Sequence, residues 1–243
     1  MHPGRGGEWA PPGPESSRPG SRGGRGEPRL ARPGPTREVC RGVRPSQPHR
    51  RGTSPVSFRI EPLSVPGLAL VHGTRHADAR GSFEEWFRAE IAERLAPGLG
   101  FVQDNLARSR AGVVRGLHFQ APPHQQAKLV GVVDGEIFDV AVDLRRGSPT
   151  YGRWLGVRLS ADESTRLFVP AGFAHGYAVT SASATVLYKV SAVHAPESEG
   201  GVAFDDPDLG ITWPVADPVV SERDRGLPRL SEFDTPFTYA EDS

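Results

Sequence analysis

The chain has 243 residues, 37% of them hydrophobic, and a formal net charge of zero at pH 7. This length allows one or two domains, and no apolar run approaches the roughly 20 residues of a membrane span, so we expect no membrane partner. The N-terminus also lacks the apolar segment of a secretory signal. The zero net charge is the sum of two regions of opposite sign. Residues 1–55 hold 11 arginines against 4 glutamates, so the rest of the chain carries the matching negative charge.

Residues 1–55 are rich in proline, glycine and arginine and show no apolar periodicity. Such a segment buries too little apolar surface to offset its ordering entropy, which predicts a disordered tail at 1–55 and one folded domain at 56–243. Three readings of the tail stay open: contact with nucleic acid, a transit peptide, and upstream sequence translated from a start placed too early. We favour the last and expect no nucleic-acid partner. The only cysteine, Cys40, lies in this tail, which fits a reducing, cytoplasmic location.

From residue 56 onward, short β-prone runs alternate with glycine, proline and aspartate. Segment 82–95 has apolar residues at helical spacing before Pro97-Gly98, which predicts a helix. Asp134-Gly135 predicts a hairpin turn, and residues 205–243 are expected to wrap around the β-structure. We expect strands at 68–71, 101–105, 113–120, 128–133, 137–143, 154–159, 166–169, 175–180 and 185–191. Many short strands with few helices indicate an all-β sandwich or barrel, and the absence of βαβ units argues against a Rossmann domain.

One β-prone segment carries a guanidinium, an imidazole and an ammonium, at Arg115, His118 and Lys128. Strand alternation places Arg115 and His118 on opposite faces, but a bend or bulge at Gly116 would let both line one cavity. Charges on an apolar background are costly unless they are satisfied, so this cluster requires an explanation. The plain alternative is an edge strand with solvated polar residues.

A Pro-x-Gly-x-x-His run ending at His175 is typical of the turn that delivers a histidine into a cupin jelly roll. Metal-binding cupins supply further ligands from a His-x-His pair, whereas His118 is followed by Phe119 and Gln120. Because a metal site usually needs three or more protein ligands, we expect no metal.

Two interior histidines without a metal suggest proton transfer, since imidazole titrates near neutrality. Tyr188 places a phenol on a late strand, and on its own we read it as a packed core tyrosine with a satisfied hydroxyl. Asp139 and Asp143 alternate along one strand, and each either satisfies a neighbouring donor or fixes a histidine tautomer.

The ordered motifs of residues 57–232 resemble the dTDP-4-dehydrorhamnose 3,5-epimerase family. These motifs are FVQDN at 101–105, VRGLHFQ at 114–120, QAKLV at 126–130, GEIFDVAVDLR at 135–145, SPTYGRW at 148–154, GFAHG at 172–176, LYK at 187–189 and GITWP at 210–214. The resemblance implies a cupin-type jelly roll (a double-stranded β-helix) that needs neither metal nor cofactor. It also implies a homodimer that exchanges strands. The implied substrate is dTDP-4-dehydro-6-deoxy-D-glucose, with inversion at C3, C5 or both.

The same resemblance implies a role for each matching residue. His118 would be the base, Asp224 its partner, Tyr188 the acid, and Lys128 the cation beside the enolate oxygen. The implied substrate-binding residues are Arg80, Glu85, Gln103, Asp104, Asn105, Arg115, His175, His194, Glu199 and Arg223.

Two positions depart from the family pattern. His194 stands where many members have a tyrosine that stacks on thymine, and Leu106 stands where many have histidine. Both changes resemble the branch of secondary metabolism in which only C3 or only C5 is inverted. The alternatives to an epimerase are a metal-dependent cupin enzyme, a non-catalytic sugar-binding jelly roll, and nucleic-acid binding through the tail.

Overall fold

The computed structural model describes residues 39–40 and 58–240 of the chain. The predicted tail therefore lies outside the described residues, except for one short strand, β1 (Val39–Cys40), which pairs in parallel with β10 (Trp154–Ser160). The boundary expected at residue 56 stays a prediction. No helix among the described residues is long and apolar enough to span a membrane.

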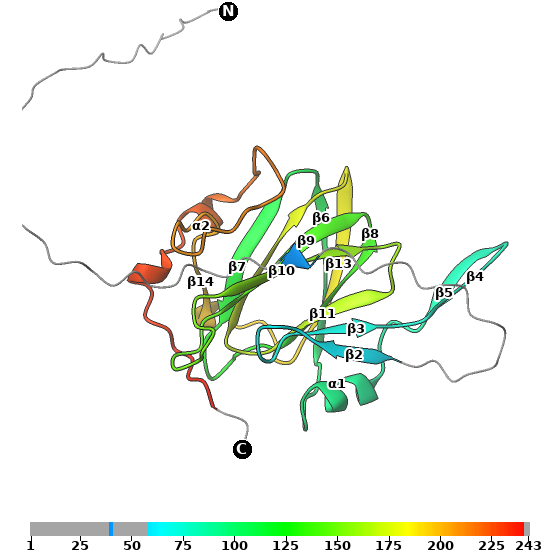
Figure 1. Ribbon diagram of the computed structural model, residues 1–243, viewed down its shortest axis with the longest axis horizontal. Helices are drawn as coiled ribbons and strands as arrows, with labels where there is room; N and C mark the ends of the chain where they lie inside the picture. Colours follow the sequence, from blue (N-terminus) through cyan, green and yellow to red (C-terminus); the bar gives the residue numbers. More distant parts are fainter. Residues whose placement is uncertain (1–38, 41–57, 241–243) are drawn as a thin grey trace, which may run out of the picture. The chain divides into compact units, whose positions relative to one another are not determined.

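Two six-stranded sheets form the body of the fold (Figure 1). In spatial order, the first sheet contains β1, β10, β9 (Glu136–Asp143), β12 (Phe173–Val179), β7 (Val114–Gln120) and β14 (Glu199–Gly201). The second contains β2 (Arg59–Pro62), β3 (Ala69–His72), β11 (Thr165–Val169), β8 (Lys128–Asp134), β13 (Ser183–Val190) and β6 (Gln103–Arg110). This arrangement confirms the predicted jelly roll.

The two sheets enclose one apolar core. Ile137 and Phe173 of the first sheet and Leu167 and Val186 of the second belong to the same buried cluster. Because successive strand residues point to opposite faces, odd-numbered residues of β9 and β12 face this core. The polar groups of the site lie on these same inner faces.

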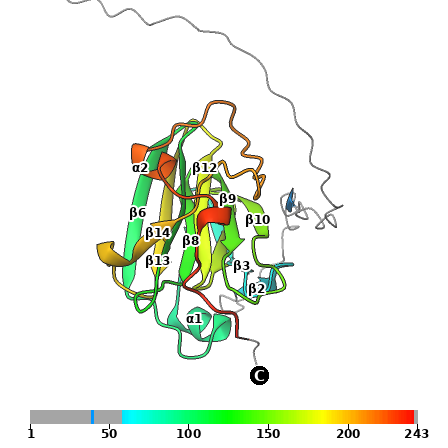
Figure 2. The ribbon, with the colours of Figure 1, turned by 90° about the vertical axis from the view of Figure 1, so that its left-hand side faces the viewer.

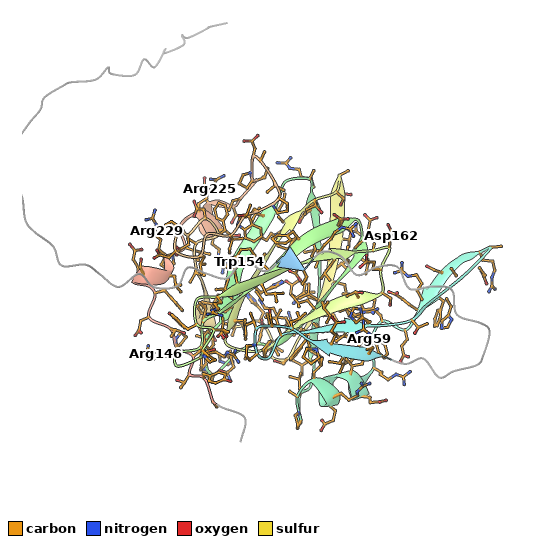
Figure 3. All side chains as sticks on the ribbon, viewed as in Figure 1. Arg59, Arg146, Trp154, Asp162, Arg225 and Arg229 are labelled. Atoms are coloured by element: carbon orange, nitrogen blue, oxygen red, sulfur yellow. The ribbon has the colours of Figure 1, made fainter. Side chains whose placement is uncertain are left out.

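The outer faces of both sheets are also covered. Helix α1 (Ala89–Leu95) contributes Ile91 to a cluster on the outer face of the second sheet. The segment after β14 covers the first sheet and includes α2 (Glu222–Arg225) and a 3-10 turn at Leu230–Glu232. Another 3-10 turn, Pro196–Ser198, immediately precedes β14. Figure 2 shows α1 and α2 at opposite ends of the sandwich. Figure 3 places Trp154 within the body, where its indole N–H donates to the Leu209 carbonyl at 2.8 Å.

Two predicted elements differ from the structure. The helix expected from residue 82 begins only at Ala89, because Gly81–Glu84 (β5) pairs with Arg75–Asp78 (β4) in a hairpin that stands away from the sandwich (Figure 1). Cross-strand pairing therefore overrides the helical spacing. Gly135 does occupy a turn, with φ of 76°, but β8 and β9 belong to different sheets. The turn connects the two layers and does not close a hairpin.

Candidate active site

A bulge in β7 brings Arg115 and His118 to the same face. His118 lies opposite His175 of β12 and Arg115 lies opposite Tyr177, so two residues of β7 match one residue of β12. Gly116 adopts a φ of 128°, which favours glycine. A Cβ at Gly116 would lie 2.6 Å from the Cα of Gly176, so the strands approach too closely for any side chain there. The strand therefore bulges at Gly116, as the shared face of the two residues requires, with His118 partly buried and Arg115 more exposed.

Helix α2 supplies a carboxylate to His118. The Oδ1 atom of Asp224 lies 2.8 Å from Nε2 of His118, and Oδ2 accepts the Gly116 N–H at 3.1 Å. Ser221 caps the helix by accepting the Asp224 N–H. Because a carboxylate only accepts hydrogen bonds, Nε2 carries the ring proton and Nδ1 keeps a free lone pair. The pair thus presents a base with a fixed tautomer.

Electrostatics keep this imidazole neutral. Burial lowers the pKa of His118, the cations Lys128 and Arg223 lower it further, and Asp224 opposes them. Burial would raise the pKa of Asp224, but its bonds from the Gly116 N–H and His118 outweigh burial and hold that pKa below its usual range. Near neutral pH the pair is therefore neutral imidazole with carboxylate, which is the form that accepts a proton.

The second sheet supplies an ammonium and a phenol. Lys128 is buried, donates to the His118 carbonyl at 3.2 Å, and has its pKa lowered by burial to about 8. Tyr188 packs against the inner core cluster. Burial raises the pKa of Tyr188, and the nearby Arg115 guanidinium opposes that rise. Base and phenol therefore come from opposite sheets of the sandwich.

A second histidine–carboxylate pair lies on the first sheet. Nε2 of His175 and Oδ1 of Asp139 are 2.6 Å apart, and both side chains are buried. Asp139 thus orients a histidine, one of the two alternatives raised by the sequence. Asp143 instead satisfies neighbouring donors, which is the other alternative, because its carboxylate accepts hydrogen bonds from Arg145, Ser148 and Thr150.

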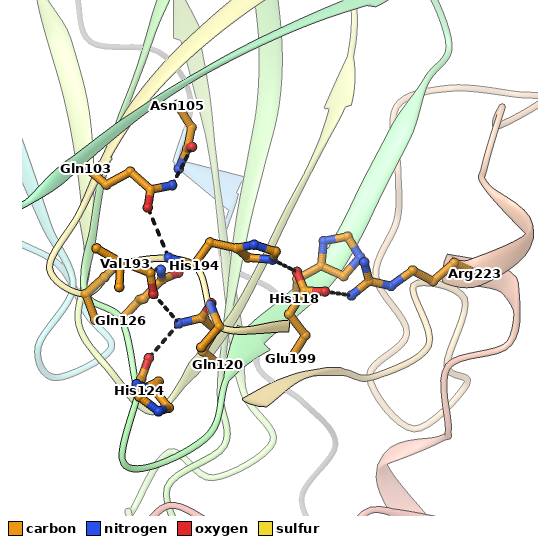
Figure 4. Close-up of polar contacts among 12 residues, drawn as sticks. Gln103, Asn105, His118, Gln120, His124, Gln126, Val193, His194, Glu199 and Arg223 are labelled. Carbon is orange, nitrogen blue, oxygen red and sulfur yellow. Dashed lines mark hydrogen bonds and ion pairs between the residues drawn. The ribbon is translucent and has the colours of Figure 1, made fainter. Parts of the chain in front are cut away.

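Five of the residues predicted to bind substrate form one polar group (Figure 4). The Gln103 side chain donates to Asn105 at 2.8 Å and accepts the His194 N–H at 3.0 Å. The His194 ring lies 3.0 Å from Glu199, and Arg223 donates to the other carboxylate oxygen at 2.6 Å. Glu199 thereby connects His194 with Arg223.

Three other predicted residues lie apart from this group. Arg80, at the hairpin turn, is 90% exposed and pairs with Asp78. Glu85 pairs with Arg88. Asp104 is exposed and bonded to Lys189, because it faces the opposite side of β6 from its neighbours in sequence.

Sequence reasoning missed Ser109. This buried hydroxyl on β6 accepts the Nε–H of Arg115 at 3.0 Å, so it holds a guanidinium that starts on the other sheet. Only the pairing of β6 into the second sheet reveals the contact, since no spacing rule relates the two positions. Within 39–40 and 58–240, no three His, Cys, Asp or Glu side chains are grouped closely enough to hold a metal ion.

The family model described as dTDP-4-dehydrorhamnose 3,5-epimerase matches residues 62–232. The chain belongs to this family. The dTDP-4-dehydrorhamnose 3,5-epimerase of Sinorhizobium fredii is 42% identical over 190 residues, which cover 77% of this chain and 97% of that protein. The dTDP-4-dehydrorhamnose 3-epimerase of Streptomyces niveus is 41% identical over 176 residues, covering 72% of this chain and 85% of the relative.

A solved member of the family shares the fold. The epimerase of Legionella pneumophila, crystallised with dTDP-4-keto-L-rhamnose, is 41% identical and superposes with a TM-score of 0.72. The match covers 76% of this chain and 100% of that one. The family match at residues 62–232 spans the two sheets from β3 to β14 and the segment that follows, and the positions of all candidate site residues fall within it.

Proposed function

We propose that the chain epimerises dTDP-4-dehydro-6-deoxy-D-glucose at C3, C5 or both, in the biosynthesis of dTDP-L-rhamnose or a related deoxysugar. The observation that carries this proposal is the His118–Asp224 pair, which lies beside a buried ammonium and across the sandwich from a phenol. Family membership supports the substrate class.

The chemistry follows from these four groups. Nδ1 of His118 removes a proton from a carbon next to the C4 ketone, and the electron pair of that C–H bond forms an enolate. The ammonium of Lys128 stabilises the enolate oxygen, because a fixed cation in a buried site needs no reorganisation. Tyr188 then protonates the same carbon from the opposite face, which inverts the centre. No redox change occurs, and solvent resets both proton carriers.

The nucleotide end of the substrate would meet the polar group around Glu199, with Arg115 beside a phosphate. Inversion at a single centre is the second candidate. It is favoured by His194 at the expected stacking position and by the similarity to the 3-epimerase of Streptomyces niveus.

We also propose a homodimer in which the β4–β5 hairpin reaches the partner's site. Among the described residues, β4 and β5 pair only with each other in a two-stranded sheet, and such a hairpin is marginally stable where it extends into water. Phe83 on it is 68% exposed, and Arg80 is remote from the residues that would share its substrate. A partner subunit would bury Phe83, and Arg80 would bind substrate in that partner's site. Since the chain's single cysteine leaves no disulfide within it, we propose a cytoplasmic location.

The test is to incubate the protein with dTDP-4-dehydro-6-deoxy-D-glucose in D₂O and to locate deuterium by NMR. Deuterium at C3 and C5 with an inverted product supports double epimerisation, and deuterium at one carbon supports the single-centre candidate. Unlabelled, unchanged substrate would contradict both.

A further inference from the structure

Arg166 is a buried cation that the proposed chemistry does not use. It lies on β11, faces the outer side of the second sheet, and is only 1% exposed. Burying a guanidinium is costly unless it is paired and hydrogen-bonded. Burial lowers the pKa of Arg166, and Glu84 offsets part of that effect. Because burying this guanidinium costs free energy, we expect its contacts to give Arg166 a specific role.

The two residues that flank Glu85, namely Glu84 and Trp86, both contact the guanidinium of Arg166. Glu84 accepts a hydrogen bond from Nη2 of Arg166 at 3.2 Å. The ring of Trp86 lies 4.8 Å from the guanidinium carbon, in a cation–π contact. Glu85 itself pairs with Arg88. Arg166 therefore fixes the chain immediately before and immediately after Glu85.

The neighbouring strand leaves room for this arrangement. Gly131 of β8 is the register partner of Arg166. A Cβ at Gly131 would lie 2.9 Å from the Trp86 ring and 3.0 Å from Cγ of Arg166. A larger residue at position 131 would separate the indole of Trp86 from the guanidinium of Arg166. The contact between them therefore depends on glycine at this position.

A second cation holds the other strand of the hairpin. Arg75 of β4 donates from Nε to Glu84 at 3.2 Å, and its Nη1 donates to the Ala161 carbonyl at 2.6 Å. Glu84 thus connects two arginines, one on the hairpin and one on the sandwich. The base of the hairpin is fixed, whereas its far end at Arg80 is exposed.

We propose that Arg166 is a positioning residue that sets the direction of the β4–β5 hairpin and holds Glu85 ready for the nucleotide of the substrate. This inference rests on the proposed function, in which the hairpin binds the nucleotide diphosphate in the partner's site. Arg166 acts through Glu84 and Trp86 and does not touch substrate.

The test compares steady-state kinetics of Arg166→Met and Gly131→Ala with the wild type, using the full-length protein and the dTDP-keto sugar. Both variants should raise KM about tenfold and leave kcat within about twofold, because lost positioning of a binding group removes uniform binding. Amide hydrogen exchange in 75–86 should accelerate in both. Arg158→Met, which removes a half-exposed surface arginine from β10, is the control and should change neither quantity.

Glu85→Gln separates this inference from the proposed function. If Glu85→Gln raises KM and folded Arg166→Met does not, the positioning role is overturned while the proposed function stands. If Glu85→Gln leaves KM unchanged, the proposed role of the hairpin fails and the inference fails with it. Should Arg166→Met not fold, Gly131→Ala and Glu84→Gln decide by the same criterion.

Discussion

Asp224 and His118 meet across the edge of the sandwich, with Oδ1 of the carboxylate 2.8 Å from Nε2 of the ring. One residue comes from a bulged strand and the other from a short helix 106 positions later in the chain. The second oxygen of Asp224 binds the backbone at the bulge itself. The carboxylate therefore holds both the ring and the backbone that aims it.

Replacing that carboxylate tests its role. Asp224→Asn should lower kcat on the order of 10²–10³-fold, because the ring loses its fixed tautomer and the anion beside it. The acidic limb of the pH–rate profile should also move to lower pH, since Asp224 raises the pKa of His118. Steady-state kinetics across pH measure both effects. Glu222→Gln, an exposed change on the same helix, is the control, and equal losses in the two variants would argue against the pair.

The pH dependence of kcat/KM should be bell-shaped. The ascending limb reports deprotonation of His118, whose pKa lies below its usual 6.5, so activity is lost only as pH falls below that value. The descending limb reports Lys128, which loses its charge as pH rises through about 8. Lys128→Arg should be slower but should hold its activity to higher pH, because a guanidinium stays protonated. An unchanged descending limb in this variant would assign it to another group.

The bulge offers a test of geometry. Gly116→Ala should cost about 2–4 kcal/mol of unfolding free energy, because the φ of 128° is strained for alanine and its Cβ would meet Gly176. Activity should fall with it as His118 moves. Gly98→Ala is the matched control, with φ of 74° and no atom within 4 Å, and should cost about 1 kcal/mol with full activity. Denaturant unfolding and turnover measure the two effects, and an active Gly116→Ala would contradict the account of the bulge.

Hybrid dimers test the exchange of hairpins. At substrate concentrations well below KM, mixing His118→Ala with the double variant Arg80→Ala, Glu85→Gln should restore about a quarter of wild-type activity. Half the dimers are hybrid, and each hybrid has one complete site. Mixing His118→Ala with Tyr188→Phe should restore nothing, because both groups belong to the body of one subunit. Activity no greater than the sum of the separate variants in the first mixture would place the hairpin with its own subunit's site.

Local sequence signals predicted the β-architecture, whereas the roles of the site residues came from the resemblance to the epimerase family and stay predictions. Strand runs and turn residues indicated an all-β sandwich or barrel, and the family resemblance implied the jelly roll. The opposite parity of Arg115 and His118 meant that they could share a face only if the strand bends or bulges at Gly116, and the structure has that bulge. The tautomer-fixing role of Asp139 was one of two alternatives, and only the 2.6 Å contact with His175 decided between them.

Features set by long-range pairing escaped prediction. The apolar spacing of Phe83, Trp86 and Phe87 is helical, yet Phe83 belongs to a hairpin whose direction depends on contacts with β11. The hairpin predicted at Gly135 was wrong for the same reason. The order of strands decides which sheet each strand joins, and the strands on either side of Gly135 join different sheets. Secondary-structure propensity depends on neighbouring residues in the sequence, whereas the pairing of strands depends on contacts across the whole fold.

The initial rate of deuterium exchange into dTDP-4-dehydro-6-deoxy-D-glucose tests the central claim most directly. Wild-type protein should exchange the protons next to the ketone, and His118→Ala should lose this exchange on the order of 10²–10⁴-fold. Tyr188→Phe should still exchange, because its base is intact, but should form far less inverted product. Full exchange by a folded His118→Ala protein would contradict the assignment of His118 as the base.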